Sequence, residues 1–449
     1  MKHTAFCDEI IKKANPLTGY SDHSDLRPLI DSIKNKKIVM LGESSHGTKE
    51  FYEWRSTISK ELLLNHGFNF ISVEGDWPPC QEVNKFIHGK NENKKDISKI
   101  GESPADQVLS HFSRWPTWMW ANSEAAELIT WLRALNSGNQ NPYGFYGLDV
   151  YSLYESIDRV TKLLNQIDPQ LAMKAKSFYS CFDSYRHDEK AYARSLFAIP
   201  EGCKKEVLSA LNETLEYKLK NIKDQDEALF DAIQNARIVC NAENYYRAMV
   251  LAEEDSWNVR DTHMMDTLNM LLKHYGPDAK GIVWAHNTHI GDYRATDMLI
   301  HGQVNIGGLA RQKYGKEKVA LVGFSTYTGS VIASHSWDGP VQVLPIPKAI
   351  EKSVESEFHN AIPKVGSQDF YVLFDNEPEF SPLVETRGQR AIGVVYHPPS
   401  EHRGNYVPTI LSDRYDAFVF FDETRPLTPL KVEVDYDKFP ETYPYGTHV

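Results

Sequence analysis

The sequence contains no apolar run approaching the roughly 18 residues that a membrane-spanning helix needs. Its first residues include acids and bases before any apolar stretch develops, so they lack the apolar core of a secretory signal. Positive charge is also scarce, because 49 Lys and Arg residues face 61 Asp and Glu residues and the formal net charge is −12. These absences argue against a membrane protein and against binding to nucleic acid or anionic lipid. They predict a cytoplasmic location.

Cysteine is scarce as well, with five residues that are scattered and form no C-x-x-C pair. An odd number of widely spaced cysteines argues against a disulfide framework and against a thiolate zinc site. We therefore expect all five thiols to be free and buried, namely Cys7, Cys80, Cys181, Cys203 and Cys240.

What the chain does contain is typical of a globular α/β protein. Of its 449 residues, 41% are apolar and 12% aromatic, which argues against disorder. Short apolar runs without clean alternation indicate strands buried on both faces, at residues 37–41, 69–73, 143–148, 281–285, 319–324, 370–374, 392–396 and 417–421. Helical spacing of apolar residues lies between them, at 50–66, 122–136, 153–166 and 257–275.

The strand pattern stops between residues 151 and 275. This segment is rich in Leu, Ala, Lys, Glu and Gln with helical periodicity and few breakers. We predict a mostly parallel central sheet covered by helices, built from residues 1–150 and 276–449, with residues 151–275 inserted as a helical subdomain. The tail from Tyr436 onward is rich in Pro and Tyr and is expected to be irregular.

Ionisable side chains follow the ends of four predicted strands, where open α/β sheets bind their ligands. Singly, each has an ordinary explanation, since acids cap helices and a lone histidine is usually a core residue with satisfied hydrogen bonds. Together they favour a functional site, because burying several such groups without a function costs several kcal/mol. The residues are Glu43, His46, Glu74, Asp149, His286 and His289.

Two arginines lie on or beside the apolar stripes of predicted helices. Arg55 lies on the stripe of the first of these helices, so it needs a carboxylate partner such as Glu43 or Glu74, or it contacts an anion or carbonyl oxygen of a substrate. The alternative is an arginine that extends to solvent from the edge of the stripe. Asp261 lies on the stripe of the 257–275 helix with Arg260 beside it, and this pair is a second candidate for the wall of the site.

Several kinds of chemistry have no signal. There is no G-x-S-x-G elbow and no glycine-rich phosphate loop after a strand. General base catalysis on water remains, since a histidine whose second nitrogen meets a carboxylate is suited to it. His46, with Glu43 beside it and Glu74 facing it, fits that role. His286, His289 or Arg55 would then stabilise an oxyanion, and a divalent metal held by the same groups stays an open alternative.

These residues stand within an ordered set of motifs, at residues 42–51, 73–77, 115–120, 147–152, 260–264, 284–292 and 421–427. Through them the chain resembles the erythromycin esterase-like family over about residues 25–430. The resemblance implies an α/β fold whose helical insert forms one wall of a deep cleft. It also implies hydrolysis of a macrolactone-type ester, as in macrolide antibiotic resistance, without an added cofactor. His46 corresponds to the general base, and the other catalytic positions correspond to Glu43, Arg55, Glu74, His286 and His289.

The expected partner is a small molecule, while the oligomeric state stays open because there is no sustained heptad seam. The candidate substrate contacts are Trp77, Trp118, Met119, Trp120, Asp149 and Arg260. For the three tryptophans and the methionine, ordinary core packing is the alternative. Two rival functions are a metal-dependent hydrolase that uses the same cluster, and a non-catalytic binding protein or one of polysaccharide biosynthesis. The second follows from the succinoglycan biosynthesis label that many relatives bear.

Overall fold

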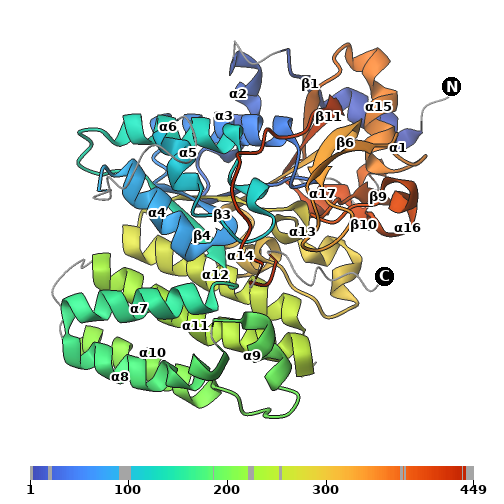
Figure 1. The fold of residues 1–449 in the computed structure, drawn as a ribbon. Helices are drawn as coiled ribbons and strands as arrows, with labels where there is room; N and C mark the ends of the chain where they lie inside the picture. Colours follow the sequence, from blue (N-terminus) through green and yellow to red (C-terminus); the bar gives the residue numbers. More distant parts are fainter. Residues whose placement is uncertain are drawn as a thin grey trace.

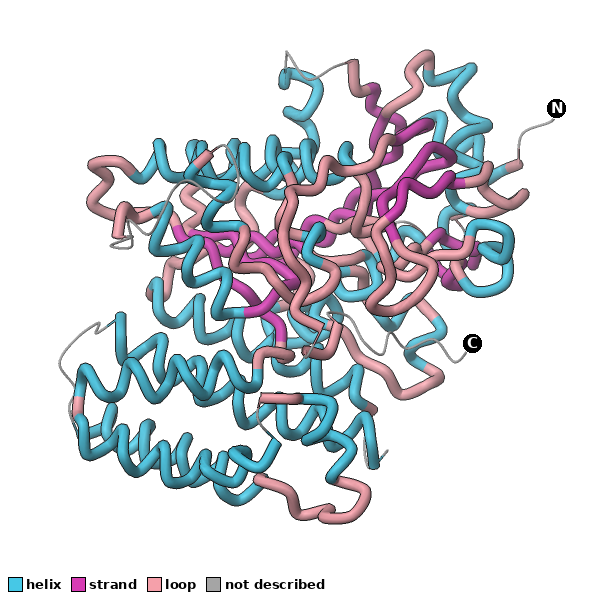
Figure 2. The backbone as a smooth tube through the Cα atoms, viewed as in Figure 1, coloured by secondary structure: helices cyan, strands magenta, loops and turns pink. Residues whose placement is uncertain are grey.

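The computed structural model describes residues 4–18, 23–90, 103–185, 187–220, 227–251, 255–374, 378, 381–436 and 438–440. Within these residues a nine-stranded sheet lies above a layer of helices, as Figures 1 and 2 show. Its strands are β1 (Ala14–Pro16), β2 (Ile38–Leu41), β3 (Phe70–Asp76), β4 (Gly144–Asp149), β5 (Gly281–Trp284), β6 (Val319–Ala333), β7 (Gln342–Ile346), β8 (Phe370–Leu373) and β11 (Ala417–Thr424).

The sheet is mostly parallel, as predicted. Its order is β1-β8-β11-β6-β2-β5-β3-β4, with β7 paired to β6. The strands from β11 to β4 in this order are parallel to their neighbours, whereas β8 runs antiparallel to β1 and β11, and β7 runs antiparallel to β6. A separate antiparallel pair consists of β9 (Thr386–Arg390) and β10 (Tyr406–Ile410).

Helices cover both faces of the sheet, which explains why β2, β3, β4 and β5 are buried along their whole length. One apolar cluster packs on one face, from α2 (Arg27–Ile33), α3 (Lys49–Asn65), α5 (Pro104–Leu109), α6 (Ser123–Asn136) and most of α4 (Trp77–Ile87). A second packs on the other face, from α1 (Ala5–Lys13), α12 (Ser256–Tyr275), α14 (Ile306–Tyr314) and α15 (Val354–Val365). Short helices α13 (Asn287–Ile290), α16 (Glu401–Gly404) and α17 (Leu411–Arg414) lie in the loops.

The described residues of the predicted insert form helices joined by turns, with no strand among them. It holds α7 (Leu153–Ile167), α8 (Pro169–Tyr179), α9 (Glu189–Ser195), α10 (Lys204–Lys220) and α11 (Glu227–Leu251), followed by α12. The first five share an apolar cluster of their own (Figure 1). The four helices expected at 50–66, 122–136, 153–166 and 257–275 correspond to α3, α6, α7 and α12 within one residue at each end. The exact domain boundaries stay a prediction.

One expected strand is absent from the described residues. Residues 392–396 were expected to form a buried strand, but Ile392 makes one isolated bridge to Ser45 and Val395 makes one to Ser334. Ile392 and Tyr396 are buried in a small cluster with the β6–β7 hairpin. The segment is apolar because it packs in that cluster, and a ladder of hydrogen bonds does not follow from apolar character alone.

The cysteine prediction is wrong for two residues. Cys181 and Cys203 form a disulfide, while Cys7, Cys80 and Cys240 are free and buried as expected. Helices α8 and α10 pack together, and Cys181, which lies just after α8, meets Cys203, which lies just before α10, with their Cα atoms 5.9 Å apart. A separation of 22 residues without a motif gives no sign of this contact.

The predicted tail lies partly outside the described residues, since residue 437 and residues 441–449 are not described. No helix of the described ranges combines the length and apolar character needed to cross a bilayer.

Candidate active site

Parallel strands bring the predicted ionisable residues to one edge of the sheet. β2, β5, β3 and β4 are neighbours in that order, so the residues at their carboxyl ends lie side by side. The loop after β2 holds Glu43 and His46, the residues after β5 include His286 and His289, and Glu74 and Asp149 lie within the ends of β3 and β4. All six side chains are buried, with at most 3% of their surface exposed.

His46 is held by a buried chain of charges. Its Nδ1 lies 3.0 Å from Oε1 of Glu43, and Oε2 of Glu43 accepts a 2.6 Å hydrogen bond from Nη2 of Arg55. Arg55 is 0% exposed, so it does not extend to solvent from the edge of its helix. Its guanidinium lies over the rings of Tyr52 and Trp284 at 4.5 and 4.7 Å. Of the partners considered for Arg55, the structure selects Glu43.

The contact with Glu43 fixes where His46 can accept a proton. A carboxylate only accepts, so Nδ1 of His46 donates to Glu43 and the lone pair of the neutral ring lies on Nε2. This Nε2 has no hydrogen-bond partner among the described residues. In particular, Glu74 makes no hydrogen bond to His46, in contrast to its expected role of orienting that ring. The ring that His46 faces is His286, with centroids 5.0 Å apart.

His286 has the opposite tautomer. It caps the short helix α13, and the backbone N–H of Thr288 donates to its Nδ1 at 3.3 Å. Thr288 Oγ1 also lies 2.8 Å from Nδ1. Because a backbone N–H can only donate, the proton of the neutral ring is on Nε2. Burial, followed by the neighbouring His46, lowers the pKa of His286 well below its usual value. His286 is therefore a neutral N–H donor beside the ring of His46.

Glu74 positions His286 and not His46. Its Oε2 accepts the backbone N–H of His286 at 2.8 Å, and its Oε1 accepts from Nη2 of Arg260 at 2.8 Å. Arg260 also donates to both oxygens of Asp149, at 2.8 and 2.6 Å. Burial alone raises the pKa of Glu74, but the charges of His289 and Arg260 outweigh burial and hold that pKa well below its usual value.

His289 completes the cluster as a cation. Its Nδ1 lies 2.8 Å from Asp261, its Nε2 lies 3.4 Å from Oε1 of Glu74, and its ring stacks on Trp257. Burial lowers the pKa of His289, but the two carboxylates outweigh it and raise the pKa to about 9. Nη1 of Arg260 approaches Nε2 at 3.1 Å, which is a hydrogen bond only for the neutral ring. In the imidazolium form, the two groups carry like charges, and Oε1 of Glu74, which contacts both of them, offsets their repulsion.

Replacing Asp261 with asparagine is expected to lower the pKa of His289 from about 9 toward its usual value, since an amide no longer stabilises the imidazolium. A raised pKa means that His289 stabilises the fold fully below about pH 6.5, and that this contribution is lost as pH rises through about 9. The variant should lose less stability over that interval. NMR titration of the ring and urea unfolding at several pH values test this, and an unchanged pKa in the variant would contradict it.

The apolar residues predicted to contact substrate are at most 3% exposed and lie in the core: Trp77, Trp118, Met119 and Trp120. Trp77 stacks on Tyr146, and Nε1 of Trp120 donates to the backbone carbonyl of Glu74. The structure gives them a packing role, and their contact with a substrate stays a prediction. Contact of Asp149 and Arg260 with a substrate also stays a prediction. In the structure Arg260 donates hydrogen bonds to Asp149 and to Glu74.

Two contributors to the site were not assigned their roles from the sequence. Asp261 was expected only as a wall group with Arg260, but it binds His289, which lies 28 residues away in the chain. The sequence signal for a buried partner was the position of Asp261 on the apolar stripe of its helix. Thr288, which fixes the tautomer of His286, gave no signal, because a polar residue in a tight turn is common.

The chain is similar to known proteins in sequence and in fold. The profile of the erythromycin esterase family matches residues 64–424. The erythromycin esterase type II of Escherichia coli is 23% identical over 398 residues, which cover 80% of this chain and 85% of that protein. The solved structure of a succinoglycan biosynthesis protein has a TM-score of 0.74 at 20% identity, covering 94% of this chain and 97% of that chain.

The structure of an erythromycin esterase mutant in its open conformation has a TM-score of 0.62 at 17% identity, covering 90% of this chain and 94% of that chain. These structural likenesses show a shared fold. The family profile spans most of the chain and includes Glu74, His286 and His289. The chain therefore belongs to the erythromycin esterase family.

Proposed function

We propose that this protein is a hydrolase that cleaves a carboxylic ester, of the macrolactone type, with water activated by His46. The observation that carries the proposal is the pairing of two buried rings of opposite tautomer. Glu43 binds Nδ1 of His46 and leaves Nε2 as the nitrogen that can accept a proton, and the neutral His286 beside it is a hydrogen-bond donor. A base and an acid placed together suit the addition of water to a carbonyl group.

The reaction follows from these positions. Nε2 of His46 takes a proton from water, and the water oxygen forms a bond to the ester carbon. The carbonyl π electrons move to the carbonyl oxygen, which accepts a hydrogen bond from His286. When the carbonyl re-forms, the C–O bond to the alkoxide breaks and His46 returns the proton to that oxygen. Glu43 stabilises the transient imidazolium of His46, and Arg55 holds Glu43 in place.

The remaining charged groups act by positioning. Glu74 holds the backbone of His286, while Arg260 and His289 hold Glu74. His46 and His286 are both 0% exposed, so an ester reaches them only when the segments over this edge move apart. Membership of the family supports a hydrolase, and the name of the Escherichia coli relative supports a macrolide ester as the first substrate to test.

Hydrolysis without a metal is part of the proposal. In the described ranges, no three His, Cys, Asp or Glu side chains are grouped to hold a metal ion. The carboxylates of Glu43 and Glu74 already bind Arg55 and Arg260, whose positive charges disfavour a further cation. Treatment with a chelator followed by dialysis is expected to leave turnover unchanged. Activity that is lost on chelation and restored by zinc or manganese would support the metal-dependent alternative instead.

The substrate test is mass spectrometry of a panel of macrolides and simple esters after incubation with the enzyme. The expected result is a product heavier than its substrate by one water. If no member of the panel is cleaved and a saccharide binds tightly, the polysaccharide-related alternative is favoured.

A further inference from the structure

After β11 the chain leaves the sheet and passes along the edge that holds the candidate site. In Figure 1 this segment is the dark red ribbon that descends from β11 toward the helical insert. Its described residues are 425–436 and 438–440, and we call them the strap. None of these residues belongs to a helix or a strand, so the position of the strap depends on its contacts with other segments.

The strap begins against the loop that holds His46. The backbone N–H of Leu427 donates to the carbonyl of Gly47 at 3.0 Å, and Pro426 forms an isolated bridge with Thr48. Gly47 and Thr48 directly follow His46 in the chain. The first part of the strap therefore lies beside the proposed general base.

The strap next passes the residues that support Glu74. The backbone N–H of Leu430 donates to the carbonyl of Ala121 at 2.8 Å. The neighbouring Trp120 donates from Nε1 to the carbonyl of Glu74 at 2.9 Å. The strap thus follows the edge from the end of β2 to the end of β3, beside His46 and Glu74, which are at most 1% exposed.

The middle of the strap is held by few contacts. Within the described residues, no backbone group of residues 431–434 forms a hydrogen bond with another backbone group. Val432 and Val434 pack on the apolar cluster of α3, α5 and α6, while Lys431 and Glu433 are exposed. A segment with so few hydrogen bonds opens locally at low cost, so the strap depends on the contacts at its two ends.

The far end of the strap is bound to both layers of the molecule. Nη1 of Arg114 donates to the carbonyl of Phe439 at 2.7 Å, and the N–H of Phe439 donates to Glu189 of α9 at 2.9 Å. Arg114 also binds Asp76 at the end of β3. The ring of Phe439 belongs to the apolar cluster of the insert, where it stacks on Tyr246 of α11 with centroids 5.2 Å apart.

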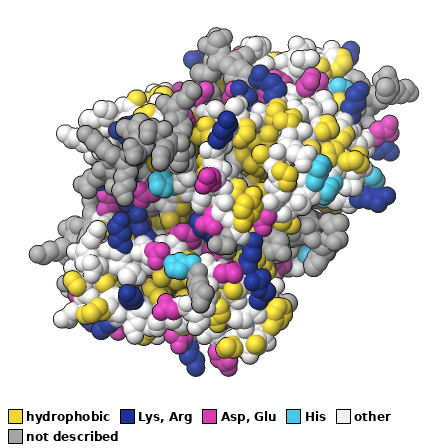
Figure 3. Space-filling model, in the orientation of Figure 1, with side chains coloured by type: hydrophobic (Ala, Val, Ile, Leu, Met, Phe, Trp, Pro, Cys, Tyr) yellow, Lys and Arg dark blue, Asp and Glu magenta, His cyan; other side chains and the backbone are white. Residues whose placement is uncertain are grey.

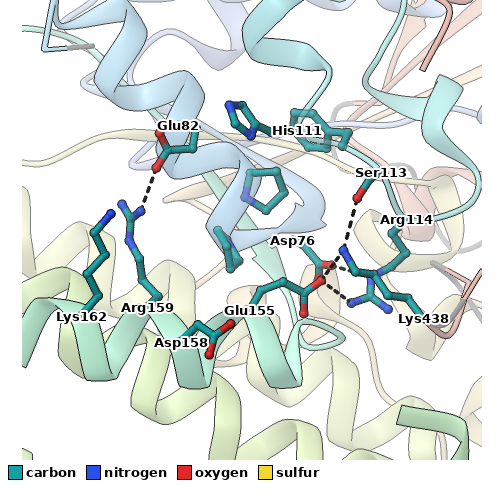
Figure 4. Close-up of a pocket in the computed structure, with 13 residues that line it drawn as sticks. Asp76, Glu82, His111, Ser113, Arg114, Glu155, Asp158, Arg159, Lys162 and Lys438 are labelled. Carbon is teal, nitrogen blue, oxygen red and sulfur yellow. Dashed lines mark hydrogen bonds and ion pairs between the residues drawn. The ribbon is translucent and has the colours of Figure 1, made fainter. Parts of the chain in front are cut away.

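Two lysines add to this end. Lys438 lies 2.9 Å from Glu155 of α7 and donates to Oγ of Ser113 at 3.2 Å (Figure 4). Lys190 of α9 donates to the carbonyl of Tyr436 at 3.2 Å. Acidic and basic side chains gather along the junction of the two layers (Figure 3). Charge as well as packing therefore holds the end of the strap against the insert.

We propose that the strap closes the candidate site and that Phe439 is the latch that holds it shut. Phe439 completes an apolar cluster of the insert from outside that subdomain, so its release uncouples the strap from the insert. The part beyond Leu430 then moves away from the edge, and a ligand reaches His46 from this side. The inference goes beyond the proposed function, because it concerns access to His46 and not the reaction there.

The test measures access to His46 directly. Diethyl pyrocarbonate modifies an unprotonated ring nitrogen of histidine, and peptide mass spectrometry gives the rate at each position. The full chain is labelled as the wild type and as Phe439→Ala, with the exposed His402 as the reference for the reagent. Loss of the ring is expected to raise the labelling of His46 relative to His402 about tenfold or more, since less apolar contact opposes local opening. Equal relative rates in the two proteins would overturn the proposal.

Two further readouts separate a latch from a general loss of stability. His263 is 2% exposed on α12, so it should stay protected in Phe439→Ala. A parallel rise at His263 would contradict a latch, because the whole fold would then be opening. Tyr436→Ala is the matched control, because Tyr436 lies on the same strap but is 59% exposed, and this variant should label His46 like the wild type.

Lys190→Met provides the same test if Phe439→Ala does not fold. The side chain of Lys190 is 26% exposed, so the change spares the core while it removes the hydrogen bond to Tyr436. Labelling of His46 should rise about threefold, and unchanged labelling would contradict the proposal. Since labelling requires no ester, hydrolysis without these changes refutes only the strap, and these changes without hydrolysis refute only the proposed function.

Discussion

His46→Ala is expected to lower the turnover of any ester that the wild-type protein cleaves by about 10²–10⁴-fold, the usual contribution of a general base. Nε2 of His46 has no hydrogen-bond partner in the described part of the chain, and the ring lies 5.0 Å from that of His286. The fold should persist, because Glu43 keeps its 2.6 Å contact with Arg55 when the ring is removed. Initial rates and thermal unfolding of the variant measure the two effects.

The matched control for this variant is His402→Ala. His402 is an exposed histidine on α16, so its removal changes composition in the same way without touching the cluster. It should keep wild-type turnover. Near-wild-type hydrolysis by His46→Ala would remove His46 from the mechanism.

Arg260→Met is expected to lower the free energy of unfolding by about 3–5 kcal/mol, the usual result of removing one partner from a buried ion pair. Arg260 is 2% exposed and binds Asp149 and Glu74, so the variant leaves two buried carboxylates without their main donor. Turnover should fall as well, since Glu74 then holds His286 less firmly. Urea unfolding and initial rates are the measurements.

Arg294→Met is the comparison for Arg260. The side chain of Arg294 is 44% exposed and forms an ion pair with Asp292 near the surface, so its loss should cost at most about 1 kcal/mol. Adding Asp149→Asn to Arg260→Met should restore part of the stability, because it removes one of the two uncompensated charges. Equal losses in the two single variants would show that the Arg260 pair does not stabilise the fold.

The sequence predicted those parts of the fold that depend on local pattern. β2, β5 and α3 were found because continuous apolar runs and helical spacing follow from burial of those segments. β9 and β10 were missed, since residues such as Arg387 and Gln389 do not resemble a buried strand. Residues 392–396 were misassigned for the opposite reason, because an apolar segment can be buried without a strand partner.

In the candidate site, too, some features followed from local sequence pattern and others did not. Parallel strands bring the residues at their carboxyl ends to one edge of a sheet, so the meeting of His46, Glu74 and His286 was predictable on the condition that their strands are neighbours. The structure supplied that strand order. The partners within the cluster were not predictable, because they depend on distant packing. Asp261 meets His289 across two elements. The disulfide of Cys181 and Cys203 likewise results from the packing of α8 against α10, which no spacing in the chain records.

Hydrolysis in oxygen-18 water tests the central claim most directly, with the wild-type protein and His46→Ala compared on the same macrolide and ester panel. The account predicts that the wild-type protein forms a product acid with one labelled oxygen in its carboxylate, and that His46→Ala forms at most about one hundredth as much. Absence of a labelled acid from every substrate, or equal labelling by the two proteins, would contradict it.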